Sequence, residues 1–195
     1  VYNSAKILEK LINEINLNIF KKFEKNYEII LVNDFSKDDS WKIIKKISME
    51  FNFVKGIDLN HNVGQHGAIF VGLKYSIGNK VIMMDDDLQH PPQSLISIYD
   101  QLDSFDACYT LYLKRKHVTW KIIVSYVNNI FSSFIFNKPF KIYTSSMKGI
   151  RGEIKNSFID NNPRIISLDS LILREAKSVT NIKVTHQERF EGKSN

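Results

Sequence analysis

The stretch Val81-Ile82-Met83-Met84-Asp85-Asp86-Asp87-Leu88-Gln89-His90-Pro91-Pro92 places four apolar residues directly before three carboxylates. The apolar run predicts the end of a buried strand, and the two prolines prevent that strand from continuing. Asp85 and Asp87 point to the same side if the backbone stays extended. With the carbonyl oxygen of Gln89 they supply the hard oxygen ligands that suit Mg²⁺ or Mn²⁺. A solvated acidic turn that caps the next helix is the alternative, because an Asp-x-Asp pair alone is a weak signal.

Two further apolar runs precede this stretch, and each is followed by a polar loop and a helix pattern. Strands are expected at residues 28–32, 53–59 and 80–84, and helices at residues 4–20, 38–51 and 65–76. This order predicts an α/β fold with a mostly parallel sheet and helices on both faces. Ligands bind beyond the carboxyl ends of the strands in such sheets. The loops at residues 33–40, 60–67 and 85–90 are therefore expected to converge on one site.

The second half of the chain has a different pattern. We expect helices at residues 95–102 and 153–177, and strands at residues 106–113 and 181–185. Between them, the segment from Trp120 to Phe136 is rich in aromatic and aliphatic side chains and is flanked by lysines. An ordinary core helix and a helix that lies at a membrane interface both fit this pattern.

Composition limits the class of protein. A chain of 195 residues with 43% apolar and 25% charged residues is expected to form one globular domain, residues 1–195. The net charge of +6 suggests an anionic partner, but the lysines are dispersed and no aromatic platform motif accompanies them, which disfavours nucleic acid. The single Cys108 excludes an intrachain disulfide and fits a reducing compartment. No apolar stretch is long enough to span a bilayer.

Five stretches in chain order resemble the family 2 glycosyltransferases with the GT-A (Rossmann-like) fold. Within them the resemblance is to the polyprenyl-phosphate sugar transferases, the group of dolichyl-phosphate mannose synthase and the undecaprenyl-phosphate sugar transferases. The stretch Met84–Pro92 is similar to the family pattern M-D-A-D-L-Q-D-P-P. The other matches are Val1-Tyr2-Asn3, Val32–Ser40 (like V-D-D-G-S-x-D-x-S/T), Asn62–Gln65 (like N-x-G-Q) and His186–Ser194 (like H-x-x-R-x-x-G-x-S).

The resemblance implies a metal-dependent, inverting transfer of a sugar from a nucleotide-sugar donor to a polyprenyl phosphate, in the synthesis of cell-envelope glycans. Asn33, Asp34 and Asp86 would bind the donor. Asp85 and Asp87 would act in catalysis with Arg189, and Asp85, Asp87 and Gln89 would hold Mg²⁺ or Mn²⁺ on the donor diphosphate. The acceptor phosphate would contact Lys114, Arg115, Lys121 and Ser125. The protein would then work at the cytoplasmic face of the membrane, as a peripheral protein or through integral segments outside this chain.

The chain departs from the family pattern at several positions. Asn33 and Phe35 replace an Asp and a Gly, and the stretch Tyr143–Lys148 lacks an Asp seen in some lipid-phosphate users. Two other functions therefore stay open. One is transfer to a glycan hydroxyl, which would need a carboxylate base such as Asp86 or Glu188. The other is a non-catalytic module that binds a sugar nucleotide.

The resemblance also implies that this chain is part of a longer protein. In the family, a central first strand immediately precedes Val-Tyr-Asn, so we expect that strand to be missing here. Many members continue past Gly-x-Ser into amphipathic or membrane-spanning helices, which are expected to be absent as well.

Overall fold

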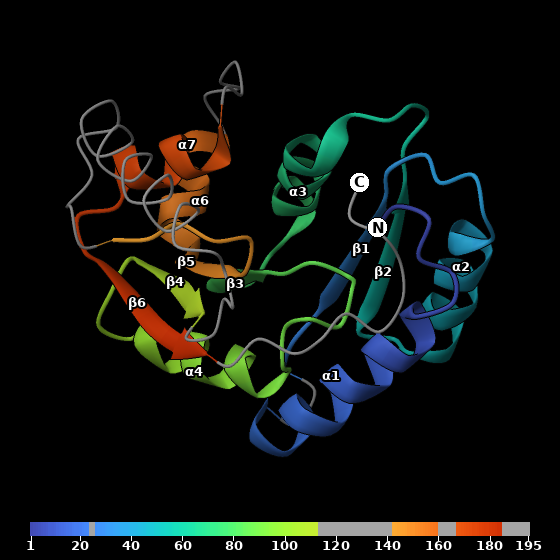
Figure 1. Ribbon diagram of the computed structural model, residues 1–195, viewed down its shortest axis with the longest axis horizontal. Helices are drawn as coiled ribbons and strands as arrows, with labels where there is room; N and C mark the ends of the chain where they lie inside the picture. The colour runs from blue at the N-terminus through green and yellow to red at the C-terminus, as the bar shows by residue number, and fades with distance from the viewer. Residues whose placement is uncertain (24–25, 113–141, 160–166, 185–195) are drawn as a thin grey trace, which may run out of the picture.

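A computed structural model of the chain describes residues 1–23, 26–112, 142–159 and 167–184, which form two β-sheets between two layers of helices (Figure 1). The elements follow one another in the order α1 (Leu8–Phe23), β1 (Ile29–Asn33), α2 (Ser40–Glu50), β2 (Val54–Asp58), α3 (Gly64–Tyr75), β3 (Lys80–Met83), α4 (Gln93–Gln101), β4 (Ala107–Tyr112), β5 (Lys148–Arg151), α6 (Gly152–Ile159), α7 (Leu168–Glu175) and β6 (Val179–Val184). The expected alternation of strands and helices in the first half is confirmed.

The strands divide into a pair and a sheet of four. β1 and β2 are parallel, with Ile29 opposite Val54. The four-stranded sheet has the order β3-β5-β4-β6, in which β5 is antiparallel to both of its neighbours and β4 is parallel to β6. The strands are thus more mixed in direction than the mostly parallel sheet expected from sequence. β3 and β4 run the same way, as a strand–helix–strand unit built on α4 should, and β5 is inserted between them.

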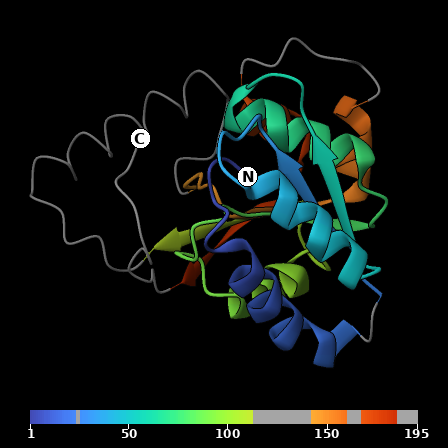
Figure 2. The same ribbon diagram turned by 90° about the vertical axis from the view of Figure 1, so that its right-hand side faces the viewer.

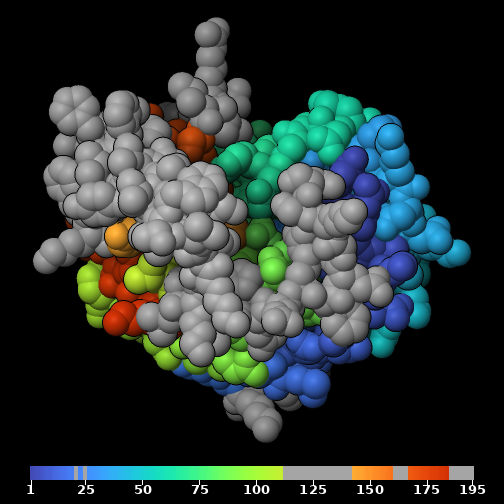
Figure 3. Space-filling model, viewed as in Figure 1, coloured from blue at the N-terminus to red at the C-terminus, as the bar shows by residue number. Residues whose placement is uncertain are grey.

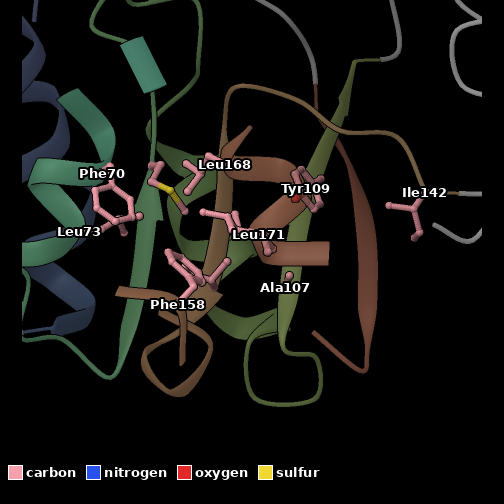
Figure 4. Packing of buried hydrophobic residues seen from close by; sticks show 11 residues of the cluster. Phe70, Leu73, Ala107, Tyr109, Ile142, Phe158, Leu168 and Leu171 are labelled. Atoms are coloured by element: carbon pink, nitrogen blue, oxygen red, sulfur yellow. The ribbon is translucent and has the colours of Figure 1, made fainter. Parts of the chain in front are cut away.

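Each face of the sheets is covered by its own group of helices (Figures 1 and 2). On one face, α1 and α4 pack against the four-stranded sheet through a cluster that includes Leu11, Ile15 and Ile98. A neighbouring cluster joins α1 and α2 to β1 and β2. On the other face, Phe70 and Leu73 of α3 lie toward the helices α6 and α7 (Figure 4). This three-layer arrangement directs the loops after β1 and β3 away from the core.

The strand β5 was not expected from sequence. It has only four residues, Lys148–Arg151, and the sequence Lys-Gly-Ile-Arg contains neither a continuous apolar run nor a regular alternation. Gly149 is required there, because a Cβ atom at that position would lie 2.3 Å from Ile98 and 3.1 Å from Leu102 of the α4 region. The glycine therefore lets α4 pack closely on the strand that holds the four-stranded sheet together.

The two sheets are separated between β1 and β3. A cavity of about 640 Å³ lies there, and the facing edges of both strands contribute to its lining, together with side chains of α1 and α3. Voids larger than a water molecule are few in packed protein interiors, so this cavity is an unusual feature of the fold. Within the described ranges, no helix combines the length and the apolar character needed to cross a bilayer.

Candidate active site

The loop after β1 is built from buried polar side chains that bind one another. Asn33 is 2% exposed, and its side-chain amide donates to Asp58 at the end of β2 over 2.7 Å. Asp34 is 4% exposed and accepts a hydrogen bond of 2.7 Å from the backbone N–H of Val63. The next residue, Phe35, has a φ of 59° and is half exposed. The polar residues predicted to bind the donor thus also join β1 to β2 and to the start of α3.

The first residues of the chain are tied to the same loop. The backbone N–H of Asn3 donates to Ser36, and the side chain of Asn3 accepts from the N–H of Lys37. Asp38 accepts from the N–H of Ala5 and from both the hydroxyl and the N–H of Ser40. Desolvation by partial burial acts to raise the pKa of Asp38, but these hydrogen bonds outweigh it and lower that pKa below its usual value. The ionised carboxylate therefore helps to hold the loop in place.

The loop after β3 carries the three aspartates. Asp85 accepts a 2.5 Å hydrogen bond from the side-chain amide of Gln65. Asp87 accepts from the N–H of Gln89 over 3.1 Å, which closes a tight turn around Leu88, whose φ is 60°. The side chain of Leu88 is buried in the cluster of α1 and α4, so it anchors the turn. The aspartates are therefore held at the surface by an apolar residue beneath them.

One oxygen atom in this loop stands out. The Oδ2 atom of Asp86 is buried and has no hydrogen-bond partner within the described part of the chain. A buried carboxylate oxygen without a partner is costly, and such atoms need an explanation. Asp85 and Asp86 also line the cavity between the sheets, as does Val1.

The first turn of α3 connects the two loops. Val63, which precedes the helix, donates its N–H to Asp34, and Gln65 in its first turn donates to Asp85. Both acceptors are carboxylates, and the amino end of a helix carries a partial positive charge that favours anions. In the space-filling view, green atoms of the segment after β3 are visible at the centre of the face, between the teal of the α3 region and the blue of the amino-terminal part (Figure 3).

Of the residues predicted for the site, Asp34 and Asp85 are joined through the start of α3, and Asp85 and Asp86 line the cavity. Asn33 is bonded to Asp58 instead. Gln89 is placed beside Asp87. Arg189, Lys114, Arg115, Lys121, Ser125 and the segment from Trp120 to Phe136 lie outside the described residues.

The oxygen atoms of the loop after β3 are suited to a divalent cation only in part. Among the residues that the structure describes, no three acidic, His or Cys side chains lie close enough to hold a metal ion by themselves. Asp85 and Asp87 nevertheless offer the hard oxygen atoms that Mg²⁺ and Mn²⁺ prefer, and Mg²⁺ usually completes its coordination with water and substrate phosphates. The chemistry of these residues fits a cation that arrives with a diphosphate, rather than one held in a cage of protein ligands.

Two residues of this region were missed as contributors to the site. Gln65 was part of a matched sequence pattern, but nothing in the sequence indicated that its amide would reach Asp85, which is 20 residues away. Asp58 gave no signal, because a carboxylate at the end of a strand is common on protein surfaces. Its contact with Asn33 depends on the parallel register of β1 and β2, which places these two residues opposite each other.

The fold and these loops define a class. Residues 1–157 match the family model described as Glycosyl transferase family 2, and the chain belongs to this family.

Among curated proteins, the chain is 30% identical over 196 residues to the undecaprenyl-phosphate 4-deoxy-4-formamido-L-arabinose transferase of Proteus mirabilis (strain HI4320). It is 27% identical over 199 residues to the protein of the same name from Shewanella sediminis (strain HAW-EB3). These alignments cover 100% of this chain and 60% and 59% of the relatives, so the chain spans about three fifths of their length.

Solved structures confirm the expected GT-A type of fold. The mannosyltransferase PcManGT of Pyrobaculum calidifontis, in complex with GDP-Man and Mn²⁺, aligns with a TM-score of 0.68 at 14% identity, over 98% of this chain and 55% of that one. Glucosyl-3-phosphoglycerate synthase of Mycobacterium tuberculosis, with Mn²⁺, UDP-glucose and phosphoglyceric acid, gives 0.64 at 11% identity, over 98% and 70%. TarS 1–349 of S. aureus gives 0.61 at 20% identity, over 95% and 57%.

Proposed function

We propose that this chain is the catalytic domain of an inverting glycosyltransferase that moves a sugar from a nucleotide-sugar donor to a polyprenyl phosphate. The observation that carries the proposal is the loop after β3, where Asp85 is held by Gln65 and Asp87 by the N–H of Gln89. Membership of glycosyl transferase family 2 supports the reaction class. The names of the relatives support the acceptor class, since they are undecaprenyl-phosphate transferases.

The donor diphosphate is proposed to lie over the three aspartates. A divalent cation, when bound with the donor, would neutralise the charge that grows on the departing nucleoside diphosphate. Asp85 and Asp87 would hold that cation, and Gln65 would keep Asp85 in the orientation that leaves its other oxygen available. Two structural neighbours were solved with Mn²⁺ and a nucleotide sugar, which supports a role for such a cation.

The nucleoside part is proposed to lie along the loop after β1. Asn33 and Asp34 are buried and bonded within the protein. In the described structure they give the loop its shape, and the exposed ring of Phe35 stands next to them. A preformed loop costs little ordering entropy when a ligand binds, so it suits recognition of a rigid base and ribose.

The acceptor phosphate is proposed to attack the anomeric carbon directly. One of its oxygens forms the new C–O bond while the bond to the nucleoside diphosphate breaks, so the configuration at the anomeric carbon inverts. An anionic phosphate needs no strong general base. Lys114, Arg115, Lys121 and Ser125 are the proposed contacts of this phosphate. The aromatic segment from Trp120 to Phe136, with these cations in and beside it, is proposed to rest on the cytoplasmic face of the membrane.

The structure offers one specific observation in favour of a second acceptor class. The Oδ2 atom of Asp86 lacks a hydrogen-bond partner in the described part of the chain, and a carboxylate in that state can accept a proton. An acceptor with a neutral glycan hydroxyl would need such a base. The polyprenyl phosphate stays the better proposal, because the relatives' names agree with it.

The deciding experiment uses the full-length protein and a donor whose nucleotide has been chosen by calorimetry over a panel of nucleoside diphosphates with Mn²⁺. Transfer of labelled sugar is then measured to a short-chain polyprenyl phosphate and, in parallel, to a soluble glycan. We expect a lipid-linked product that keeps the labelled sugar with inverted configuration. Transfer to the glycan alone would replace the proposed acceptor by a hydroxyl, and Asp86→Asn should then abolish the activity.

The proposed contact with the membrane is tested separately, by binding to lipid vesicles. Sedimentation with anionic vesicles should bring down the protein at low salt and release it at high salt, because each cation near an anionic surface contributes about 1 kcal/mol. Replacing Lys114, Arg115 and Lys121 together by Glu should remove this binding. A matched control replaces three lysines of α2 by Glu, namely Lys42, Lys45 and Lys46, and should leave vesicle binding in place. Equal loss in both variants would point to net charge and not to the proposed segment.

A further inference from the structure

Phe35, in the loop after β1, combines two features that are unusual for a large aromatic residue. Its side chain is 51% exposed to solvent. Its backbone has a φ of 59°, in the left-handed region that bulky residues rarely adopt. Strain of this kind costs stability, persists only where the surrounding structure imposes it, and is found most often at functional sites. Phe35 thus gains neither full burial nor a relaxed backbone from its position.

Hydrogen bonds hold the backbone on both sides of this residue. Before it, the carbonyl of Asp34 accepts from the side-chain amide of Asn62 over 3.1 Å. After it, the hydroxyl of Ser36 accepts from the N–H of Asn3 over 3.0 Å. Asn3 also has a positive φ, of 54°, so the conformation of this contact is constrained on both of its sides. These bonds fix the backbone from which the ring of Phe35 projects.

The segments that meet at this loop each contribute one apolar side chain that is partly exposed. The exposed fraction is 39% for Tyr2 and 39% for Val63, compared with 51% for Phe35. The carboxylate of Asp34, which is bonded to the N–H of Val63, belongs to a residue that is only 4% exposed. The loop therefore offers mainly apolar and aromatic side chains to a ligand. Aromatic faces of this kind suit a flat, aromatic ligand.

The start of α3 relates this apolar surface to the three aspartates. Val63 donates its N–H to Asp34 in the loop after β1, and Gln65, two residues further on, donates to Asp85 in the loop after β3. The two loops thus lie beside the same turn of one helix. A nucleoside diphosphate that places its phosphates over the aspartates has its base directed toward the loop of Phe35.

We propose that Phe35 binds the nucleobase of the donor by stacking its ring on the face of the base. This inference rests on the proposed function and adds to it the contact that holds the base. Every base has an aromatic face, so stacking provides affinity for nucleotides as a class and does not by itself select a purine or a pyrimidine. The contact also explains why the ring is exposed, since a side chain that is buried in the protein cannot meet a ligand.

Calorimetric titration of the full-length protein in the presence of Mn²⁺ tests the proposal. The ligands are UDP, GDP and inorganic pyrophosphate, which has no base. Phe35→Leu keeps an apolar side chain and removes the aromatic face, so the affinities for UDP and GDP should both fall by about 10-fold or more. The affinity for pyrophosphate should stay the same. Phe35→Tyr keeps the ring and should retain most of the affinity for both nucleotides.

The matched control is Tyr75→Leu. Tyr75 is an exposed aromatic residue at the carboxyl end of α3, whereas the two loops lie at the amino end of that helix. The control removes an exposed aromatic ring in the same way, and it should change none of the three affinities.

Unchanged affinities of Phe35→Leu for UDP and GDP would overturn this inference alone, because nucleotide binding would still support the proposed function. A loss for only one of the two bases, or an equal loss for pyrophosphate, would overturn it as well. If the unmodified protein binds neither nucleotide, the proposed function fails and the inference fails with it.

Phe35→Gly provides a second, independent measurement. Glycine adopts a φ of this sign without strain, so the midpoint of urea unfolding should not fall, while the affinity for both nucleotides should. This combination is expected of a residue that is kept for binding at a cost in stability. A lower midpoint with unchanged nucleotide affinity would show that Phe35 is a structural residue, and the inference would be wrong.

Discussion

The loops after β1 and after β3 follow two strands that line the same cavity. The two loops differ in how far the protein itself satisfies the hydrogen bonds of their polar side chains. In the first loop, Asn33 and Asp34 are almost fully buried, and protein donors and acceptors satisfy them. In the second, the aspartates are half buried, Asp85 is bonded to an exposed side chain, and Asp86 keeps one oxygen without a partner among the described residues.

This difference suggests that the first loop mainly stabilises the fold and that the second mainly binds ligand. The polar side chains of the first loop hold β1, β2 and α3 together through hydrogen bonds, so substitutions there should act mainly on stability. The second loop retains carboxylate oxygens that an incoming ligand can use, so changes there should act mainly on binding. α3 touches both loops through Val63 and Gln65, which lets a change in one loop reach the other.

The largest effect is expected from Asp87→Asn. Asparagine can still accept the hydrogen bond from the N–H of Gln89, so the turn should survive while the negative charge is lost. Metal-dependent nucleotide affinity should fall by at least about 100-fold, because a cation on the diphosphate then loses a charged ligand. Calorimetric titration of UDP and GDP, with and without Mn²⁺, measures this change, and the free energy of unfolding should change by less than about 0.5 kcal/mol.

The matched control for that variant is Asp100→Asn. Asp100 is an exposed carboxylate on α4 that pairs with Lys22, so the substitution removes the same charge outside the loop. Nucleotide affinity should be unaffected. An Asp87→Asn protein that binds nucleotide as tightly as before, with or without Mn²⁺, would contradict the assignment of the second loop to ligand binding.

The second effect is expected from Asp34→Ala, and it should be a loss of stability. The variant leaves the N–H of Val63 without its acceptor in a buried position and should lower the free energy of unfolding by about 1–3 kcal/mol. Urea unfolding measures the change, with Asp39→Ala, an exposed carboxylate of the same loop, as the control. If Asp34→Ala unfolds like the unmodified protein but loses nucleotide affinity, the two loops do not differ as described.

Sequence reasoning was accurate where a local pattern determines the structure. The apolar runs before Asn33 and Asp85 identified β1 and β3, because buried strands in α/β folds are continuously apolar. It failed for β5, whose Gly149 is explained only by the approach of α4. No local signal distinguishes such a strand from a loop.

The sequence was sufficient to predict which loops form the candidate site. It was not sufficient to predict which side chains of those loops contact each other. Gln65 and Asp85 come from different strand–helix units, and their hydrogen bond exists because α3 begins beside the end of β3. The burial of Asn33 likewise depends on the parallel register that places Asp58 opposite it. The spacing of residues along the chain does not determine tertiary contacts of this kind. The contacts of Gln65 and Asp58 could therefore be identified only from the structure.

A smaller effect is expected from Gln65→Met, which keeps the length of the side chain and removes its donor. Asp85 then loses the hydrogen bond that orients it, and the affinity for Mn²⁺ with nucleoside diphosphate should fall by about 10-fold, the lower end for residues that support a metal ligand. Metal-free nucleotide affinity should stay unchanged, which a purely structural role would not predict. Met at the neighbouring exposed position, His66→Met, is the control, and equal losses in both variants would remove the special role of Gln65.

The smallest effect concerns the pH dependence of stability in the first loop. Partial burial acts to raise the pKa of Asp38, but the hydrogen bonds from Ser40 and Ala5 lower it in the folded protein. A carboxyl group whose folded pKa is depressed stabilises the fold above its unfolded pKa, and that stabilisation is lost as the pH falls through the folded pKa. Asp38→Asn should therefore be less stable than the unmodified protein at pH 7, and the difference should shrink below about pH 4.

Urea unfolding at pH 7, 5 and 3 measures this convergence, with Asp39→Asn as the control at the next position. Most of Asp38 is still in contact with solvent, so screening keeps the effect small. Its importance lies in its partners, since Ala5 belongs to the segment that leads from Val1 into α1. If the fold is anchored at this point, protonation of Asp38 loosens the residues beside Val1 first, and the hydrogen exchange of Ala5 should accelerate at low pH before that of Leu31. Simultaneous acceleration of both amides would mean that the first loop and the strand before it open as one unit.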